Sequence, residues 1–475
     1  MVSMSIIKQM VDLIPDIRSF RQVNGIKQRD LAEILDISLN ELMRFERGFL
    51  EIPESILYKL KIINLESNSK IKKITRSTGE GYITSKPKSN SFTNRNASID
   101  PNKLHIIDLF CGVGGLSHGF AKTGKFQVTA GVDLLGDRLS TFVSNHPFAT
   151  AHGQDIRNVS IADLKESGPK PFVIVGGPPC QGFSSLRPFR NVEKDDPRNN
   201  LAEEFVRIVS GLQPEWVVFE NVVGLITHSR GKILKNIQAA FEEIGYRVSA
   251  KVINGASFGL PQKRERLIII GNRSGKPIMW PSPTHHFNYK SMSGRSDLII
   301  EPQRTLSKEL DQAVTFNDST IDLPEVRSGE SIDFYRQNIV AHQYAKSMRN
   351  GSNALTMHEA TKHSEKMMEI IRHAGANISA LPAGMVTSGF SSCYSRLSAD
   401  EPSTTITVNF VHPASNRCIH PTQDRALTPR EGARLQSFED TFVFKGTRSQ
   451  IVKQIGNAVP PLIGQVVAET ILASV

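Results

Sequence analysis

The amino-acid sequence predicts an α/β protein with a doubly wound, mostly parallel sheet, an inserted second domain and a small all-α N-terminal domain. From residue 103 onward, short apolar segments rich in β-branched residues alternate with helical segments, as in strands joined by crossover helices. Between residues 275 and 395, polar and loop-rich sequence replaces this alternation, which predicts an insertion. The first 65 residues show a helical spacing of apolar side chains instead.

Composition limits the classes of protein that fit. The 475 residues exceed one typical core, so several domains are expected. The formal net charge of +10 suits a polyanion partner, although many basic proteins bind nothing acidic. The four cysteines form no C-x-x-C pair, which favours a reducing, cytoplasmic setting over a zinc site or disulfide framework. No run of about eighteen apolar residues occurs, so no membrane partner is expected.

The N-terminal segment, residues 1–65, is predicted to form short helices. Residues 27–37 place their apolar side chains on one helical face. Residues 38–48 begin with Ser38 and carry Glu41 three positions later, the pattern of a capping box. Two short helices joined by a tight turn are typical of a DNA-binding unit.

The arrangement of these two helices resembles the helix-turn-helix of phage-repressor-like regulators. On that interpretation the polar side of the second helix faces DNA early in its length. The residues expected to contact DNA are Ser38, Asn40 and Arg44. The alternative is a small helical appendage that serves only for packing.

Residues 66–102 are rich in Ser, Asn, Thr and Lys and show no apolar periodicity. This composition predicts a flexible, basic linker.

The strands of the α/β domain are expected where the apolar segments lie. These segments are 104–110, 126–133, 171–177, 216–222 and 266–272. Helical patterns at 201–212 and 231–245 separate some of them. Ligands of doubly wound sheets bind beyond the carboxyl ends of the strands, so the site residues are expected there.

The first expected strand leads into a glycine-rich loop at residues 112–115. Ser117 occupies the third glycine position of the dinucleotide fingerprint, which favours a ligand without a pyrophosphate. Asp133 ends the next strand, where an acid typically holds ribose hydroxyl groups. Asp155 ends or follows a third strand. Together these features predict a small ligand that contains a nucleoside, although isolated glycines would indicate only a turn.

Cys180 follows a strand and the stiff turn Gly-Gly-Pro-Pro. Most lone cysteines are buried structural residues, but a rigid turn at a strand end is a good platform for a nucleophile. Glu220, near the end of another strand, can protonate a substrate if burial raises its pKa. Arg264 and Arg266 are two residues apart and face the same way if their segment is extended.

These segments together resemble the cytosine-C5 DNA methyltransferase family over about residues 104–475, excepting the insertion. The matching segments, in the order usual for the family, are "DLFCGVGGL", "GGPPCQGFS", "FENV", "LPQKRERLIIIG", "RLSADEPSTTIT", "TPREGARLQSF" and "QIGNAVPP". The resemblance implies the fold of S-adenosylmethionine-dependent methyltransferases, with S-adenosyl-L-methionine as cofactor and double-stranded DNA as partner. No metal is expected.

The resemblance also implies roles for individual residues. Cys180 is similar to the nucleophile, Glu220 to the acid at N3 of the base, and Arg264 and Arg266 to the pair near the base and its phosphate. The residues expected to contact target DNA are Gln181, Ser184 and Gln262. The residues expected to hold the cofactor are Phe110, Gly112, Gly114, Gly115, Leu116, Asp133, Asp155, Ile156, Pro178, Asn457 and Val459. Leu134 departs from relatives that have an aromatic residue against the adenine.

The predicted organisation has five parts. A helix-turn-helix domain (1–65) and the linker (66–102) precede the catalytic domain (103–274); a target recognition domain (275–395) is followed by the part that completes the catalytic domain (396–475). This architecture predicts a bacterial, nucleoid-associated modification enzyme paired with a restriction endonuclease. The N-terminal domain is expected to repress its own operon, with dimerisation through that domain as one option.

Two other functions remain open from the sequence. A transfer-RNA-modifying branch shares these motifs, so an RNA cytosine methyltransferase is one alternative. A non-enzymatic regulator that retains the fold is the other.

Two further sets of residues have simpler interpretations. Cys111, Cys393 and Cys418 are expected to be ordinary interior residues, and His285, His286, His358 and His363 to form polar surface or DNA contacts rather than a metal site.

Overall fold

The structure is a computed structural model. The residues that it describes are 17, 21, 26–35, 37, 39–46, 56, 91–92, 99–179, 201–227, 231–287, 291, 296–300, 310–387 and 389–475. The chain divides into two compact units, Met1–Pro87 and Lys88–Val475.

The first unit contains the two helices expected there, α3 (Gln28–Leu35) and α4 (Leu39–Glu46). Their apolar faces share a core made of Ile17, Ile26, Leu31, Ala32, Leu35, Leu42 and Ile56. Arg21 and Gln28 both donate hydrogen bonds to the carboxylate of Glu46 and so fix the end of α4. Helix formation at both segments is therefore confirmed, whereas their use as a helix-turn-helix stays a prediction.

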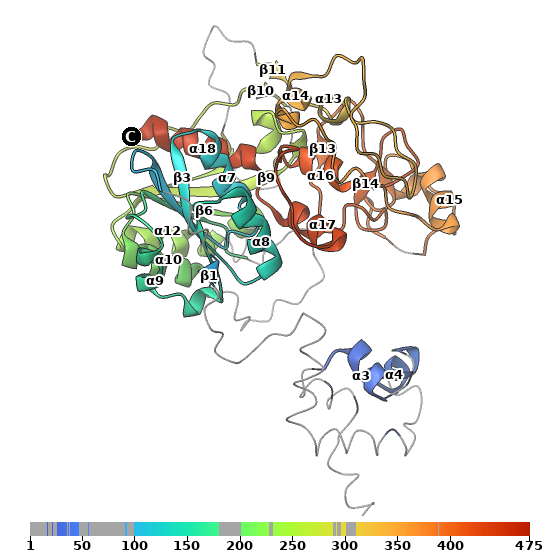
Figure 1. Cartoon of the computed structure of the whole chain (residues 1–475), viewed down its shortest axis with the longest axis horizontal. Helices are drawn as coiled ribbons and strands as arrows, with labels where there is room; N and C mark the ends of the chain where they lie inside the picture. Colours follow the sequence, from blue (N-terminus) through green and yellow to red (C-terminus); the bar gives the residue numbers. More distant parts are fainter. Residues whose placement is uncertain are drawn as a thin grey trace, which may run out of the picture. The chain divides into compact units, whose positions relative to one another are not determined.

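The second unit is built on a mixed sheet in the order β1-β4-β3-β2-β5-β6-β9-β7 (Figure 1). Its strands are β1 (Ser91–Phe92), β2 (Leu104–Leu109), β3 (Phe126–Asp133), β4 (Thr150–Gly153), β5 (Val173–Gly176), β6 (Trp216–Val222), β7 (Arg247–Asn254) and β9 (Glu265–Asn272). The strands from β4 to β6 are parallel, and β9 runs antiparallel to both β6 and β7. The expected α/β class with a mostly parallel sheet is confirmed.

Two strands differ from the sequence-based expectation. β1 pairs antiparallel with β4 through Ser91 opposite His152, inside the range 66–102 expected to be a linker, whose bounds stay a prediction. Backbone pairing at a sheet edge holds this polar segment in place without any apolar periodicity. β7 was not expected at all, because Arg247–Asn254 mixes polar and apolar residues at the other edge of the sheet.

Helices cover both faces of the sheet (Figure 1). They are α7 (Gly115–Lys122), α8 (Gly136–Asn145), α9 (Ile161–Glu166), α10 (Leu201–Leu212), α11 (Gly224–Thr227), α12 (Lys232–Glu243) and α18 (Pro461–Ser474). One core lies beneath α9 to α12, and a second lies beneath α7 and α18. Residues 448–474 are apolar and long enough to cross a membrane, but 67% of the apolar window is buried inside the protein, so packing explains its composition.

The remaining helices lie beside the sheet (Figure 1). They are α13 (Phe316–Thr320), α14 (Gln343–Arg349), α15 (Glu365–His373), α16 (Pro429–Leu435) and α17 (Arg448–Asn457). Short paired strands join them: β8 (Gln262–Lys263) with β13 (Ser403–Thr404), β10 (His285–His286) with β11 (Asp311–Gln312), and β12 (Ser395–Arg396) with β14 (Arg417–Ile419). The loss of regular alternation after residue 275 is confirmed, and the boundaries of the insertion at 275 and 395 stay predictions.

Candidate active site

The glycine-rich loop after β2 makes a sharp turn before α7. Phe110, Gly112 and Gly114 all have positive φ, at 60°, 55° and 82°. Such angles cost little at glycine but strain a side-chain-bearing residue such as Phe110. The turn places the N-terminus of α7 at the carboxyl edge of the sheet, where the sequence predicted a ligand.

Asp133, the last residue of β3, fixes this loop. Its carboxylate accepts hydrogen bonds from the backbone N–H groups of Gly112 and Leu135, each at 2.9 Å. Burial raises the pKa of Asp133, and the nearby Arg138 opposes that shift. Two predicted cofactor residues from adjacent strands are thereby brought into direct contact.

The glycines of the loop differ in their surroundings. A Cβ on Gly112 would meet nothing within 4 Å, so this residue faces open space. A Cβ on Gly115 would lie 2.2 Å from the carbonyl oxygen of Val459, so only glycine allows this approach. Gly115 and Val459, far apart in sequence and both predicted to hold cofactor, are therefore in contact.

The open side of Gly112 fits the adenosyl part of the expected cofactor. Asp133 supplies carboxylate oxygens at its edge, and the adjacent Leu134 is 54% exposed although apolar. A carboxylate is a suitable acceptor for ribose hydroxyl groups, and an exposed leucine can pack against a flat base. The residues present therefore fit S-adenosylmethionine.

Other predicted cofactor residues have contacts within the protein. Asp155 caps the short helix Ile156–Asn158, and the hydrogen bond from Arg157 lowers its pKa. Ile156 and Leu116 are buried in the two cores, and Pro178 is buried beside the sheet edge. Their contact with cofactor stays a prediction, as does that of the exposed Asn457.

Asp108 in β2 is a buried acid that the sequence-based prediction missed. Ser117 of α7 donates a hydrogen bond to its carboxylate at 2.5 Å, which ties the helix to the strand beneath it. Burial raises the pKa of Asp108 to about 7. An acid within a strand, followed nine residues later by a serine in the helix, was the available signal.

The turn that leads to Cys180 is partly described. A Cβ on Gly177 would lie 2.6 Å from Oε2 of Glu220, so the glycine allows the acid to lie against the backbone. The side chain of Asn221 donates a hydrogen bond to the carbonyl of Pro178 at 3.1 Å and holds the turn against β6. Cys180, Gln181 and Ser184 lie outside the described residues, as does Ser38. Asn40 and Arg44 lie in α4, but their side chains are likewise outside the description.

Glu220 forms an ion pair with Arg266 across the antiparallel strands β6 and β9. Arg266 Nε lies 2.8 Å from Oε1 of Glu220, and both side chains are largely buried. Burial raises the pKa of Glu220, while Arg266 and Arg264 counteract part of that shift. A buried carboxyl with a raised pKa and a fixed orientation is suited to proton donation.

Gln262 and Arg264 differ from expectation. Gln262 is 0% and Arg264 2% exposed, and both side chains form hydrogen bonds inside the protein, with each other and with residues 406–458. Arg264 lies between β8 and β9, and its guanidinium points to carbonyl groups near α17 rather than alongside Arg266. Gln262 is therefore buried among protein groups, and its expected contact with DNA stays a prediction.

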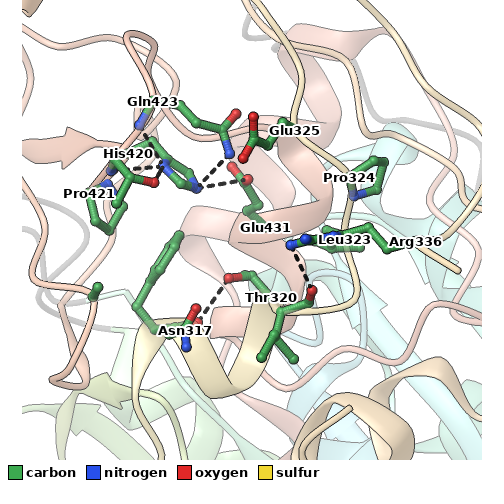
Figure 2. A pocket seen from close by; sticks show the side chains of 14 residues that line it. Asn317, Thr320, Leu323, Pro324, Glu325, Arg336, His420, Pro421, Gln423 and Glu431 are labelled. Carbon is green, nitrogen blue, oxygen red and sulfur yellow. Dashed lines mark hydrogen bonds and ion pairs between the residues drawn. The ribbon is translucent and has the colours of Figure 1, made fainter. Parts of the chain in front are cut away.

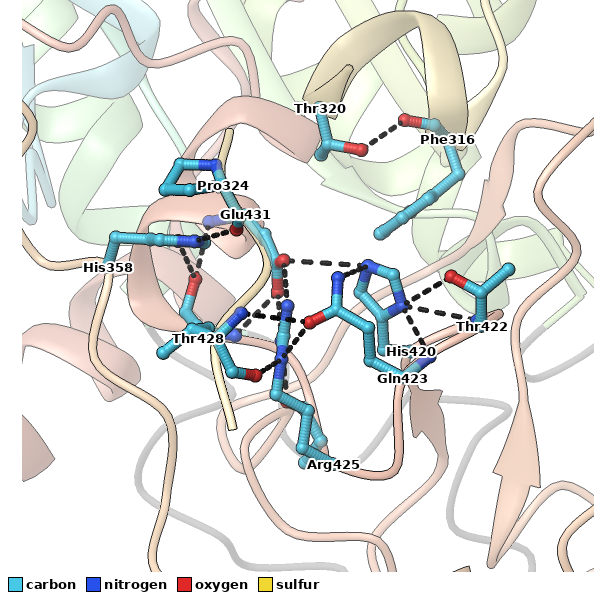
Figure 3. Close-up of polar contacts among 12 residues, drawn as sticks. Phe316, Thr320, Pro324, His358, His420, Thr422, Gln423, Arg425, Thr428 and Glu431 are labelled. Atoms are coloured by element: carbon cyan, nitrogen blue, oxygen red, sulfur yellow. Dashed lines mark hydrogen bonds and ion pairs between the residues drawn. The ribbon is translucent and has the colours of Figure 1, made fainter. Parts of the chain in front are cut away.

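A cavity beside α13 and α16 contains charged and polar side chains (Figure 2). Arg425 forms two hydrogen bonds to Glu431, at 2.8 and 2.7 Å, next to His420 (Figure 3). Burial alone would raise the pKa of Glu431, but Arg425 and His420 hold it below its ordinary value.

The prediction that His358 forms polar surface or DNA contacts was wrong. It is 1% exposed, and its ring contacts the carbonyl of Pro324 and the hydroxyl of Thr428.

The three described cysteines, Cys111, Cys393 and Cys418, are buried and free, which confirms their interior placement. Two capping boxes, Thr428 with Glu431 and Thr447 with Gln450, begin α16 and α17. Their S/T-x-x-E/Q spacing was a signal in the sequence for these two helices, neither of which was predicted.

Comparisons with known proteins agree with this geometry. The family model for C-5 cytosine-specific DNA methylase matches residues 104–473. The type II methyltransferase M1.HphI of Haemophilus parahaemolyticus is 35% identical over 375 residues, covering 78% of this chain and 87% of that protein. M.DdeI of Desulfomicrobium norvegicum is 32% identical over 394 residues, covering 78% and 88%.

Solved structures show the same fold. A structure assigned to a DNA modification methyltransferase encoded within a prophage (E. coli) has a TM-score of 0.59 and 25% identity. It covers 78% of this chain and 99% of its own. The chain belongs to the C-5 cytosine-specific DNA methylase family, and it is a DNA (cytosine-5)-methyltransferase that uses S-adenosylmethionine as its methyl donor.

Proposed function

We propose that this enzyme methylates C5 of a cytosine that is flipped out of a specific site in duplex DNA. The observation that carries the proposal is the buried Glu220, paired with Arg266 and lying against Gly177 of the turn before Cys180. An acid with a raised pKa therefore lies against the turn that precedes the expected nucleophile in the sequence. The reacting atoms of cytosine are shielded by stacking in the duplex, so the base must leave the helix to reach them.

The chemistry follows from the residue types. C5 of cytosine is a poor nucleophile. Addition of the Cys180 thiolate to C6 makes C5 the nucleophilic carbon of an enamine. Glu220 gives a proton to N3 during this addition, which keeps negative charge from building up on the ring. Arg266 holds the carboxyl in place and favours negative charge on the adjacent ring oxygen. When C5 has been methylated, it loses its proton to a solvent water molecule, the electrons of that bond form the C5–C6 double bond, the C6–sulfur bond breaks to release the Cys180 thiolate, and N3 returns its proton to Glu220.

S-adenosylmethionine, when bound, supplies the electrophilic methyl carbon. The loop from Phe110 to Leu116 and the carboxylate of Asp133 would hold it, with Val459 closing the opposite side of Gly115. Asp155, Ile156, Pro178 and Asn457 complete the proposed set, on the family resemblance.

A covalent adduct tests this function directly. Duplex DNA containing 5-fluorocytosine blocks the loss of the C5 substituent, so the enzyme should remain attached through Cys180. Cys180→Ala should form no adduct, and Glu220→Gln should form it much more slowly. An enzyme that forms no adduct with any duplex DNA, yet methylates transfer RNA, would support the RNA alternative; absence of both activities would support the non-enzymatic regulator.

We also propose that the enzyme modifies DNA for a restriction-modification system. The relatives M1.HphI and M.DdeI are type II methyltransferases, and they match about as much of this chain as the family model does. Residues 275–395 would read the site, and a cognate endonuclease would cut the unmodified sequence. Bisulfite sequencing of DNA from bacterial cells that express the enzyme, where it would act in the cytoplasm on the nucleoid, should show one fully methylated motif. Methylation scattered over unrelated sequences would contradict it.

A second proposed function belongs to the N-terminal unit. Its own apolar core and two short helices support a helix-turn-helix that binds the operator of its own operon, with Ser38, Asn40 and Arg44 toward DNA. Mobility-shift assays with the upstream DNA should show binding that Arg44→Ala weakens. Sedimentation of the complex would establish whether one or two copies bind.

A further inference from the structure

Gln436 is the C-cap residue directly after helix α16 and is 0% exposed. Its amide nitrogen donates hydrogen bonds to the carbonyls of Ile455 and Ala458, at 2.8 and 3.4 Å. Its amide oxygen accepts a hydrogen bond from Gln262 at 3.0 Å. Both ends of this side chain are therefore used, so its orientation is fixed by chemistry as well as by packing.

Gln262 continues the connection toward Arg264. The amide oxygen of Gln262 accepts hydrogen bonds from the backbone N–H of Ile406, at 3.1 Å, and from Arg264, at 3.4 Å. Arg264 in turn donates to the carbonyl of Ala458 at 2.9 Å. Gln436 and Arg264 thus converge on the same carbonyl, and the three side chains form a closed network.

The network is connected through neighbouring residues of the chain to the cofactor loop and to the pair formed by Glu220 and Arg266. Ala458 immediately precedes Val459, whose carbonyl packs on Gly115 of the cofactor loop. At the other end, Arg264 lies two residues before Arg266, which pairs with Glu220. Segments that are distant in sequence are therefore tied together across the interior of the protein.

Helix α16, which Gln436 caps, is itself firmly anchored. Thr428 and Glu431 form a capping box at its start, and Arg425 binds Glu431 (Figure 3). Arg434, near the end of the helix, forms ion pairs with Asp440 and Asp322. Paired, buried charges of this kind resist rearrangement, because separating them would leave an unpaired charge inside the protein.

We propose that Gln436 is a positioning residue. It holds residues 456–459 against the cofactor loop, and it keeps Arg264 fixed two residues before Arg266, the partner of Glu220. This inference rests on the proposed roles of Glu220 and Val459. Gln436 contacts neither of these residues, so it acts through the carbonyl of Ala458 and through Gln262.

The experiment replaces Gln436 by methionine, which keeps the length of the side chain and removes both polar ends. The dissociation constant for S-adenosylmethionine, measured by titration calorimetry on the full-length enzyme without DNA, should rise about tenfold. The KM for duplex DNA should change less than twofold. Gln127→Met is the matched control, because Gln127 is also a buried glutamine with a backbone partner, the N–H of Asp100 at 2.7 Å, but lies at the start of β3. It should leave cofactor affinity unchanged.

Gln262→Met supplies a second approach to the same network if Gln436→Met folds poorly. It should weaken cofactor binding by a similar factor, and the double variant should be less impaired than the product of the two single effects. Cofactor affinity within twofold of wild type in both folded variants overturns the proposal, as does an equal loss in Gln127→Met. Glu220→Gln separates this result from the proposed function: if it keeps full turnover, the proposed acid is wrong, whereas normal cofactor affinity in Gln436→Met refutes only the positioning role.

Discussion

Burial and charge act in opposite directions on Glu220. Removal from water favours the protonated carboxyl, while Arg266 at 2.8 Å favours the carboxylate. The outcome is a raised pKa, which leaves the group able to give a proton and to take it back. The sequence allowed this role to be predicted, because Glu220 lies near the end of an apolar strand. Its partner could be chosen only from the structure, since Arg264 and Arg266 are equally close in sequence.

Replacing Arg266 by methionine should show how much the pair contributes. Without the arginine, burial raises the pKa of Glu220 further, so the folded state holds its proton more tightly than the unfolded state. The contribution of Glu220 to stability is then fully present below the pKa of the unfolded state. It is lost as pH rises through the raised pKa of the folded state. The free energy of unfolding of the variant should be about 3 kcal/mol lower than that of the wild type at pH 8. The difference should be smaller at pH 5. Urea denaturation at both pH values measures this, and a loss that is equal at both would contradict it.

Asp108 offers a test of burial without a countercharge. Its pKa of about 7 in the folded state exceeds the ordinary value of 3.8, so the folded protein is penalised as pH rises between these values. Asp108→Asn removes the charge but still accepts the hydrogen bond from Ser117. The variant should be more stable than wild type at pH 8, by on the order of a few kcal/mol, and the gain should shrink toward pH 5. Thermal unfolding across this range decides the matter, because a gain independent of pH would rule out titration of Asp108.

At the scale of elements, close backbone approach holds the cofactor helix in place. A Cβ on Gly119 of α7 would lie 2.0 Å from the carbonyl of Pro461, and one on Gly464 of α18 would lie 2.2 Å from that of Leu116. The two helices therefore meet at glycines, as they could not with larger residues. The sequence does not predict their contact, because nothing local to either segment specifies a partner so distant in the chain.

Gly119→Ala should accordingly separate α7 from α18. Overpacking costs typically 1–3 kcal/mol, and contact with rigid backbone makes the upper part of that range, about 3 kcal/mol, the expected loss. Cofactor affinity should fall as well, because α7 begins at the glycine-rich loop. Gly136→Ala, at the start of α8, is the control: its Cβ would meet nothing within 4 Å, so its stability should be unchanged or slightly higher. Urea denaturation of both variants makes the comparison, and equal stability of the two would refute the packing argument.

At the scale of the whole molecule, the sequence was informative wherever a local pattern sufficed. Apolar segments predicted β2, β3, β5, β6 and β9 because buried parallel strands and their neighbours are apolar throughout. It was uninformative where distant partners decide the structure. The hydrogen bond between Gln262 and Gln436 joins residues 174 apart, and neither residue alone predicts it. Residues 275–395 are likewise held by contacts with distant segments, such as the ion pair between Asp322 and Arg434. Their own sequence therefore showed no apolar periodicity.

The division into two units makes a final prediction about the whole chain. The family match at 104–473 lies entirely within the second unit, Lys88–Val475, and β1 at Ser91–Phe92 belongs to its sheet. A cut after Pro87 therefore removes the N-terminal unit and leaves every strand that the structure describes in place. The truncated enzyme should methylate duplex DNA with kcat and KM within about twofold of the full chain, because no described active-site residue is lost.

The same truncation should abolish operator binding, since that proposed function depends only on the removed helices. Mobility shift with the upstream DNA, in the presence of excess DNA that carries no methylation site, separates this from binding by the catalytic unit. A well-folded truncation that fails to methylate would show that the first unit serves catalysis. If it still bound the operator with unchanged affinity, the helix-turn-helix proposal would be wrong, because binding would then reside in the methyltransferase unit itself.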